Sequence, residues 1–96
     1  MRKLFFVAAI ATGLSVGGVA YAQDAAKLAD TAGCMKCHDV EKKKMGASFK
    51  SVAAKYKGKQ DADKTIIAKV KSGEGHPKAT ASDADLASIV KWVLAM

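Results

Sequence analysis

Apolar residues recur at three- and four-residue intervals in four segments of the chain, which is the spacing of one face of an α-helix. Their apolar positions are Ala25, Leu28, Ala29 and Ala32; Phe49, Val52, Ala53 and Tyr56; Ile66, Ile67 and Val70; and Leu86, Ile89, Val90, Val93 and Leu94. No segment shows the strict alternation of apolar and polar residues that a half-buried strand would give. The pattern therefore predicts an all-α fold of four short helices.

Capping residues mark the ends of these predicted helices. Candidate N-caps precede them in order: Asp24, Ser48, Asp61 and Ser82. Ser82 and Asp85 also have the S-x-x-D spacing of a capping box. Gly58 follows the second helix, and Gly73 should end the third, which is expected over residues 62–72. The connections are short, so the four helices are expected to form one domain.

The first 22 residues have the layout of a secretory signal peptide. Arg2 and Lys3 form a basic start, an apolar segment follows over residues 4–20, and Ala20-Tyr21-Ala22 fits the small-x-small cleavage rule. The alternative is an uncleaved membrane anchor, but the apolar segment is slightly short for a full span and three glycines interrupt it. Cleavage after Ala22 and export to the periplasm are therefore expected.

Cleavage would leave one domain of 74 residues, from Gln23 to Met96, without an internal repeat. Loss of Arg2 and Lys3 would lower the formal net charge from +7 to +5 with neutral histidines. Chains shorter than about 80 residues seldom bury enough apolar surface to fold without a disulfide, a metal or another staple. We therefore expect a cofactor at the centre of this small core.

The segment Cys34-Met35-Lys36-Cys37-His38 predicts what that cofactor is. Two thiols about one helical turn apart can each add to one vinyl group of a porphyrin, and the adjacent imidazole can bind the iron from the proximal side. These are the chain's two cysteines, so haem attachment leaves none for a disulfide. The motif therefore indicates one covalent haem c, with thioethers at Cys34 and Cys37 and with His38 on the iron.

From Gln23 to Met96 the chain resembles the small bacterial monohaem class I cytochromes c. The resemblance rests on the haem motif, the segment from Lys43 to Phe49, the helical segments that follow, and the closing Lys91-Trp92-Val93-Leu94. It implies a small cytochrome c fold wrapped around one haem, in which the first and last helices cross and Trp92 packs into the crossing. It also implies an electron carrier rather than an enzyme, with no catalytic residues.

Two departures from the family pattern concern the iron ligands. The family usually has Gly-Pro where this chain has Gly46-Ala47; the carbonyl that accepts a hydrogen bond from the proximal histidine is still present, but the turn is less restricted. In place of the family's axial methionine and following proline, this chain has His76-Pro77. The resemblance thus implies His38 and His76 as the two iron ligands, and a lower reduction potential than histidine–methionine ligation gives.

The methionines of the mature chain are poor alternatives to His76. Met35 lies between the attachment cysteines, Met96 is the chain end, and Met45 is expected to pack on the proximal side where the family has a core aliphatic residue. A five-coordinate or water-bound iron, or ligation by a lysine such as Lys78, stays open.

Three other functions would use part of the same residues. A thiol–disulfide enzyme would also show C-x-x-C, but it should bring a βαβ pattern, which the sequence lacks. A zinc site would need both cysteines and both histidines, and the adjacency of Cys37 and His38 makes tetrahedral binding awkward. A haem-based gas sensor or small haem enzyme would differ only in an open or displaceable distal site, so it stays the alternative. Arg2 is the chain's only arginine, and no acid–base pair stands out for peroxidase chemistry.

Lysines gather around the attachment segment. Lys36, Lys42, Lys43 and Lys44 lie within a few residues of it, where small cytochromes leave one haem edge exposed. They either guide the acidic surface of a redox partner to that edge or only solubilise a turn. The expected partners are redox proteins; nucleic acid binding is not expected, nor is a membrane span after signal cleavage.

Overall fold

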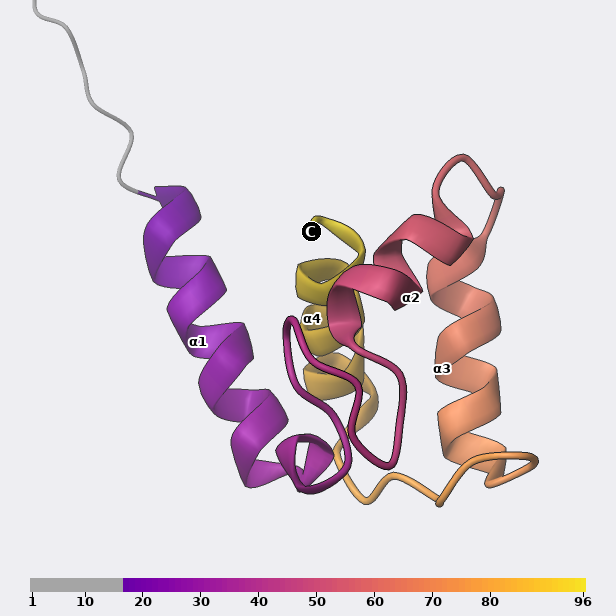
Figure 1. The fold of residues 1–96 in the computed structure, drawn as a ribbon. Coiled ribbons are helices and arrows are strands. Elements are labelled where there is room, and N and C mark those ends of the chain that lie inside the picture. Colours follow the sequence, from indigo (N-terminus) through magenta and orange to yellow (C-terminus); the bar gives the residue numbers. More distant parts are fainter. Residues whose placement is uncertain (1–16) are drawn as a thin grey trace, which may run out of the picture.

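The structure, a computed structural model, describes residues 17–96, with side chains from residue 24 onward (Figure 1). Four α-helices and one 3-10 turn follow one another: α1 (Gly17–Thr31), η1 (Cys34–Lys36), α2 (Phe49–Tyr56), α3 (Ala62–Ser72) and α4 (Asp83–Leu94). Residues 17–96 contain no strand, so the all-α prediction is confirmed. Within the same range, no helix has the length and apolar character needed to cross a membrane. Residues 1–16, most of the predicted signal peptide, lie outside the described residues.

Helix α4 is the centre of the fold. It packs against α1, α2 and α3, and in Figure 1 it lies between α1 and α3 with α2 beside it. Four residues of its predicted apolar stripe are buried: Leu86, Ile89, Val90 and Val93. Ala29 of α1 and Phe49 of α2 join Ile89 and Val93 in one buried cluster. The small side chain of Ala29, which is fully buried, lets α1 approach α4 closely.

Three of the predicted helix boundaries form as expected. The hydroxyls of Ser48 and Ser82 each accept a hydrogen bond at 3.2 Å from the N–H three residues later. Gly73 follows α3 in the left-handed conformation (φ 75°), and its N–H donates to the carbonyl of Lys69 at 3.2 Å. The α3 helix consequently has the bounds that its sequence predicts, Ala62–Ser72.

Of the other two N-cap predictions, that of Asp24 is wrong, and Asp61 has the N-cap position but makes no side-chain cap bond. Helix α1 begins at Gly17, so Asp24 lies inside the helix, because alanines on either side of it favour helix over a boundary. The helix therefore continues through the predicted cleavage site after Ala22. Asp61 does stand just before α3, but in the left-handed conformation (φ 55°) and without a side-chain bond to the first turn. Its carboxylate lies 3.8 Å from the Lys64 ammonium instead.

Candidate haem site

The haem motif forms a tight turn directly after α1. Gly33 leads into η1 in the left-handed conformation (φ 83°). The backbone N–H groups of Cys37 and His38 then both donate to the carbonyl of Cys34, at 3.3 and 3.0 Å. Both cysteines are free and half-buried, and burial raises the pKa of the Cys34 thiol. The turn therefore leaves two partly accessible thiols one turn apart, which suits attachment to two vinyl groups of one porphyrin.

The loop after His38 holds the ring of His38 on several sides. Its Nδ1–H donates to the carbonyl of Ala47 at 2.6 Å, so the bond expected at the family's proline position forms without the proline. The ring packs nearly parallel to Phe49, with the two ring centres 5.1 Å apart. Gly46 lies directly against the ring, because a Cβ at this position would be 2.8 and 2.9 Å from the two ring nitrogens. Since a carbonyl can only accept, the proton is on Nδ1 and Nε2 carries the free lone pair.

His76 lies in the loop between α3 and α4. Gly73 and Gly75 give this loop its shape, each in the left-handed conformation (φ 75° and 69°). The N–H of Ala79 returns the loop to α3 through a hydrogen bond of 2.8 Å to a carbonyl of that helix. The Nδ1 of His76 is 2.7 Å from the carbonyl of Pro77, so this ring also carries its proton on Nδ1 and has a free Nε2.

The fold brings the two imidazoles together from segments far apart in the sequence. The ring centres of His38 and His76 are 6.0 Å apart, and the ring planes differ by 10°. A metal bound by two imidazoles at about 2.0–2.1 Å from each nitrogen holds the two ring centres about 6 Å apart. Both rings keep the basic nitrogen that a metal needs, because the other nitrogen donates its N–H to a backbone carbonyl. The donor set thus fits a haem iron with two nitrogen ligands.

The methionines lie in three different settings. Met35 is partly buried against the core cluster, Met96 at the chain end is 38% exposed, and Met45 is 86% exposed. The prediction that Met45 packs on the proximal side is therefore wrong. Its neighbour Gly46 fills the place against His38, and the side chain of Met45 is left in solvent. In the part of the chain that the structure describes, no group of three or more His, Cys, Asp or Glu residues could hold a metal ion by itself.

Trp92 lies beside the contact between the first and last helices, as the resemblance implies. It packs against the cluster that α1, α2 and α4 share, and edge-on to Phe49 with ring centres 5.7 Å apart and planes at 75°. Phe49 thus has Trp92 on one side and His38 on another. The helical spacing of Phe49 predicts only a core residue. The contact of Phe49 with the proximal histidine is therefore a feature that the sequence did not reveal.

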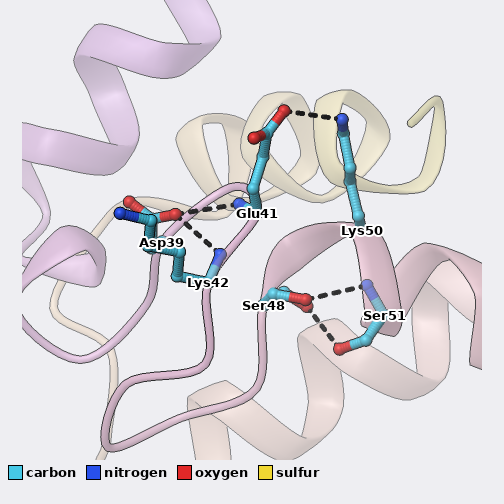
Figure 2. Close-up of polar contacts among 6 residues, drawn as sticks. All are labelled: Asp39, Glu41, Lys42, Ser48, Lys50 and Ser51. Carbon is cyan, nitrogen blue, oxygen red and sulfur yellow. Dashed lines mark hydrogen bonds and ion pairs between the residues drawn. The ribbon is translucent and has the colours of Figure 1, made fainter.

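Asp39 organises the loop between the haem motif and α2 (Figure 2). Its carboxylate accepts hydrogen bonds from the N–H groups of Lys42 at 2.8 Å and Glu41 at 2.9 Å. These two bonds hold the pKa of the Asp39 carboxyl below its ordinary value. Glu41 in turn forms an ion pair of 2.8 Å with Lys50 of α2. Asp39 is not among the residues predicted from the sequence; its one signal is that aspartate often opens turns of this kind.

Comparison with known proteins shows that the model of the family described as cytochrome c matches residues 22–96. The chain belongs to the cytochrome c family. It is similar to cytochrome c-552 of Hydrogenobacter thermophilus, with 31% identity over 100% of this chain and 99% of the relative. It is also similar to cytochrome c-552 of Nitrosomonas europaea, with 37% identity over 90% of this chain and 89% of the relative. Among solved structures, the class 1 cytochrome MtoD of Sideroxydans lithotrophicus ES-1 has 37% identity and a TM-score of 0.65, covering 80% of this chain and 94% of that chain.

Membership in the family establishes the cofactor and the general activity. A cytochrome c carries one covalently attached haem c, and Cys34 and Cys37 fit the C-x-x-C-H motif that holds it. The homologous cytochromes are electron carriers and not enzymes. This cytochrome c domain has their fold, with four helices described in residues 17–96.

Proposed function

We propose that this cytochrome c is a periplasmic carrier of one electron whose haem iron is bound by two histidines. In this proposal Cys34 and Cys37 form the thioethers, His38 is the proximal ligand and His76 is the distal ligand. The single observation that supports this ligation most strongly is the pair of imidazoles at 6.0 Å. The bound haem would supply one-electron redox chemistry, and the protein residues would fix its ligands and its surroundings.

The two histidines are suited to act as permanent ligands. Each Nδ1 donates to a backbone carbonyl, so neither ring needs to change its tautomer to offer Nε2 to a metal. Two nitrogen ligands also leave no open position for a substrate, which favours electron transfer over gas binding or catalysis. Because methionine as a sixth ligand raises the potential of a cytochrome c, the reduction potential should be lower than that of relatives with histidine and methionine.

Optical and EPR spectra of the ferric protein test the ligand pair directly. We expect a low-spin iron without a methionine–iron charge-transfer band. His76→Ala should give high-spin character and fast binding of carbon monoxide to the ferrous form, and His76→Met should raise the potential. Lys78→Ala is the matched control in the same loop and should leave the spectra unchanged. An unmodified protein that is already high-spin and binds carbon monoxide without delay would favour the gas-binding alternative instead.

Covalent attachment is tested separately from ligation. Protein made with a cytochrome maturation system should keep its haem through acid–acetone extraction, since thioether bonds survive that treatment. Replacing both Cys34 and Cys37 by alanine should release the haem. An intact mass equal to that of the apoprotein with two free thiols would rule out these two attachment residues.

The periplasmic location rests on the proposed signal peptide, residues 1–22. The family match begins at residue 22, next to the proposed cleavage site. Mature protein purified from a periplasmic extract should have a mass that corresponds to a chain beginning at Gln23. Retention of residues 1–22 in the mature protein, together with association with membranes, would instead support the uncleaved anchor.

A further inference from the structure

The loop of residues 73–82, which carries His76 from α3 to α4, has few contacts that hold it in place (Figure 1). None of residues 73–82 is buried. Apart from the bonds at its two ends, one backbone hydrogen bond returns it to α3, from the N–H of Ala79 to the carbonyl of Val70 at 2.8 Å. Segments with few buried apolar contacts open locally at a low cost in free energy. The loop therefore depends on polar contacts to stay closed.

The proximal ring is held more firmly than the distal one. Phe49, which is buried in the core, packs on the ring of His38, and the carbonyl of Ala47 accepts its N–H. The corresponding bond of His76 goes to the carbonyl of Pro77, which belongs to the same loop and moves with it. If local opening displaces one of the two imidazoles, it is therefore the imidazole of His76.

An ion pair joins the two ends of this loop. The ammonium of Lys71, in the last turn of α3, lies 2.6 Å from the carboxylate of Asp83, the first residue of α4. Of the ion pairs found in residues 24–96, it is the one that connects α3 with α4. Each charge also suits its helix end, because a cation is favourable at a C-terminus and an anion at an N-terminus. The pair thus holds together the two helix ends between which the loop runs.

The strength of this link is modest but measurable. The two side chains are 46% and 76% exposed, so solvent weakens their attraction. Exposed pairs of this kind change an equilibrium by about two- to fivefold. Such a contribution does not decide whether the domain folds. It is large enough to change how often a weakly held loop opens.

We propose that Lys71 and Asp83 are positioning residues whose ion pair keeps the loop of residues 73–82 closed and thereby sets how often His76 leaves the distal position. The proposal rests on the proposed ligation by His76 and adds the control of that ligand to it. With the pair intact, the loop stays closed and the distal side offers no open position. With the pair broken, the loop opens more often, and a small gas molecule such as carbon monoxide reaches the distal side sooner.

Two measurements on the haem-bound ferrous protein follow the loop and the ligand separately. Amide hydrogen exchange of Ala79, measured by NMR, reports opening of the loop, because this N–H is bonded to α3 only while the loop is closed. The rate of carbon monoxide binding at saturating gas reports the release of His76. The spectrum of the ferric protein tests ligation by His76 on its own.

Lys71→Met and Asp83→Asn should each raise both rates about two- to fivefold. The double variant should exceed neither single variant, because one change already removes the pair. Lys71→Arg keeps the charge and should keep the rates of the unmodified protein. Raising the salt concentration from about 0.01 M to about 1 M shortens the Debye length from roughly 30 to 3 Å, and it should speed the unmodified protein but not Lys71→Met.

Asp85→Asn is the matched control, because Asp85 lies in the same first turn of α4 and forms no ion pair in residues 24–96. It should leave both rates near those of the unmodified protein. Equal acceleration by Asp85→Asn and Asp83→Asn would overturn the proposal, since charge at the helix end and not the pair would then be responsible.

The two readouts also separate this proposal from the ligation on which it rests. Unchanged exchange of Ala79 and unchanged carbon monoxide binding in Lys71→Met would overturn the role of the ion pair, even if the ferric spectrum is low-spin. A high-spin ferric spectrum together with faster exchange of Ala79 in Lys71→Met would refute ligation by His76 and confirm that the pair closes the loop.

Discussion

Gly46 is the position where one methyl group should disturb the site most. A Cβ on Gly46 would lie 2.8 and 2.9 Å from the ring nitrogens of His38, closer than real Cβ atoms come to their neighbours. The ring cannot easily retreat, because Ala47 holds its Nδ1 at 2.6 Å and Phe49 packs on it. Gly46→Ala therefore forces either the loop or the ring to move.

The expected loss of stability comes from two effects, overpacking against the His38 ring and loss of its hydrogen bond to Ala47. Overpacking in a well-packed site costs about 1–3 kcal/mol, and a lost hydrogen bond of the kind between His38 and Ala47 costs about 1 kcal/mol. We expect the free energy of unfolding to fall by about 2–3 kcal/mol. For a domain of 60–100 residues, 1 kcal/mol shifts Tm by about 4–8 °C, so Tm should fall by about 8–24 °C.

Thermal unfolding of the haem-bound protein, followed by circular dichroism and by the Soret band, measures this loss. Gly58→Ala is the control, because Gly58 also has a positive φ (75°) but has nothing within 4 Å of an added Cβ. It should lose about 1–2 kcal/mol through backbone strain and keep the haem spectrum of the unmodified protein. Gly46→Ala should also change the spectrum or the reduction potential, since His38 moves. A Gly46→Ala protein with an unchanged spectrum and no greater loss than Gly58→Ala would refute the reasoning.

Three further predictions concern the helix caps, Asp39 and the haem-free chain. Ser48→Ala and Ser82→Ala should each lower the free energy of unfolding by about 1 kcal/mol in denaturant titrations, because each removes an N-cap bond; losses below about 0.3 kcal/mol would mean that water replaces the caps. The Asp39 carboxyl should titrate below the usual value of about 3.9 in NMR measurements. Its stabilising effect should be present above that pH and disappear as the pH falls through the lower folded pKa, and an Asp39 pKa at or above 3.9 would contradict it. Apoprotein should show weak helical circular dichroism, since ordering costs about 1–2 kcal/mol per residue for the backbone; cooperative unfolding of haem-free chain near the midpoint of the holoprotein would show that the core suffices alone.

Local signals in the sequence predict the helices and several of their boundaries. Ser48, Ser82 and Gly73 act as expected, because a hydroxyl cap or a left-handed glycine depends only on neighbouring residues. Asp24 does not, since a favourable residue type at a possible boundary does not stop a helix that its neighbours extend. Asp61 precedes α3 as expected, but its left-handed backbone makes no side-chain cap bond. The haem motif is predictable for the same reason as the caps, because its chemistry lies within five consecutive residues.

The rest of the site depends on contacts between distant segments. The sequence indicates His76 as a candidate ligand through the family's methionine position, but the distance between His38 and His76 depends on how the α3–α4 loop folds back. Family position also predicts a buried Met45, and this is wrong because Gly46 and not Met45 faces the ring. Such errors arise wherever a shift of one position along the chain decides which side chain points inward.

The position of α4 at the centre of the fold has a consequence for biogenesis. Since α1, α2 and α3 all pack on the last helix in chain order, the core cannot close until that helix has been synthesised. For the exported protein that we propose, this delay would keep the growing chain unfolded, as passage through a secretion channel requires. The same delay keeps the thiols of residues 34–38 accessible to the haem-attachment machinery before the rings of His38 and Phe49 stack.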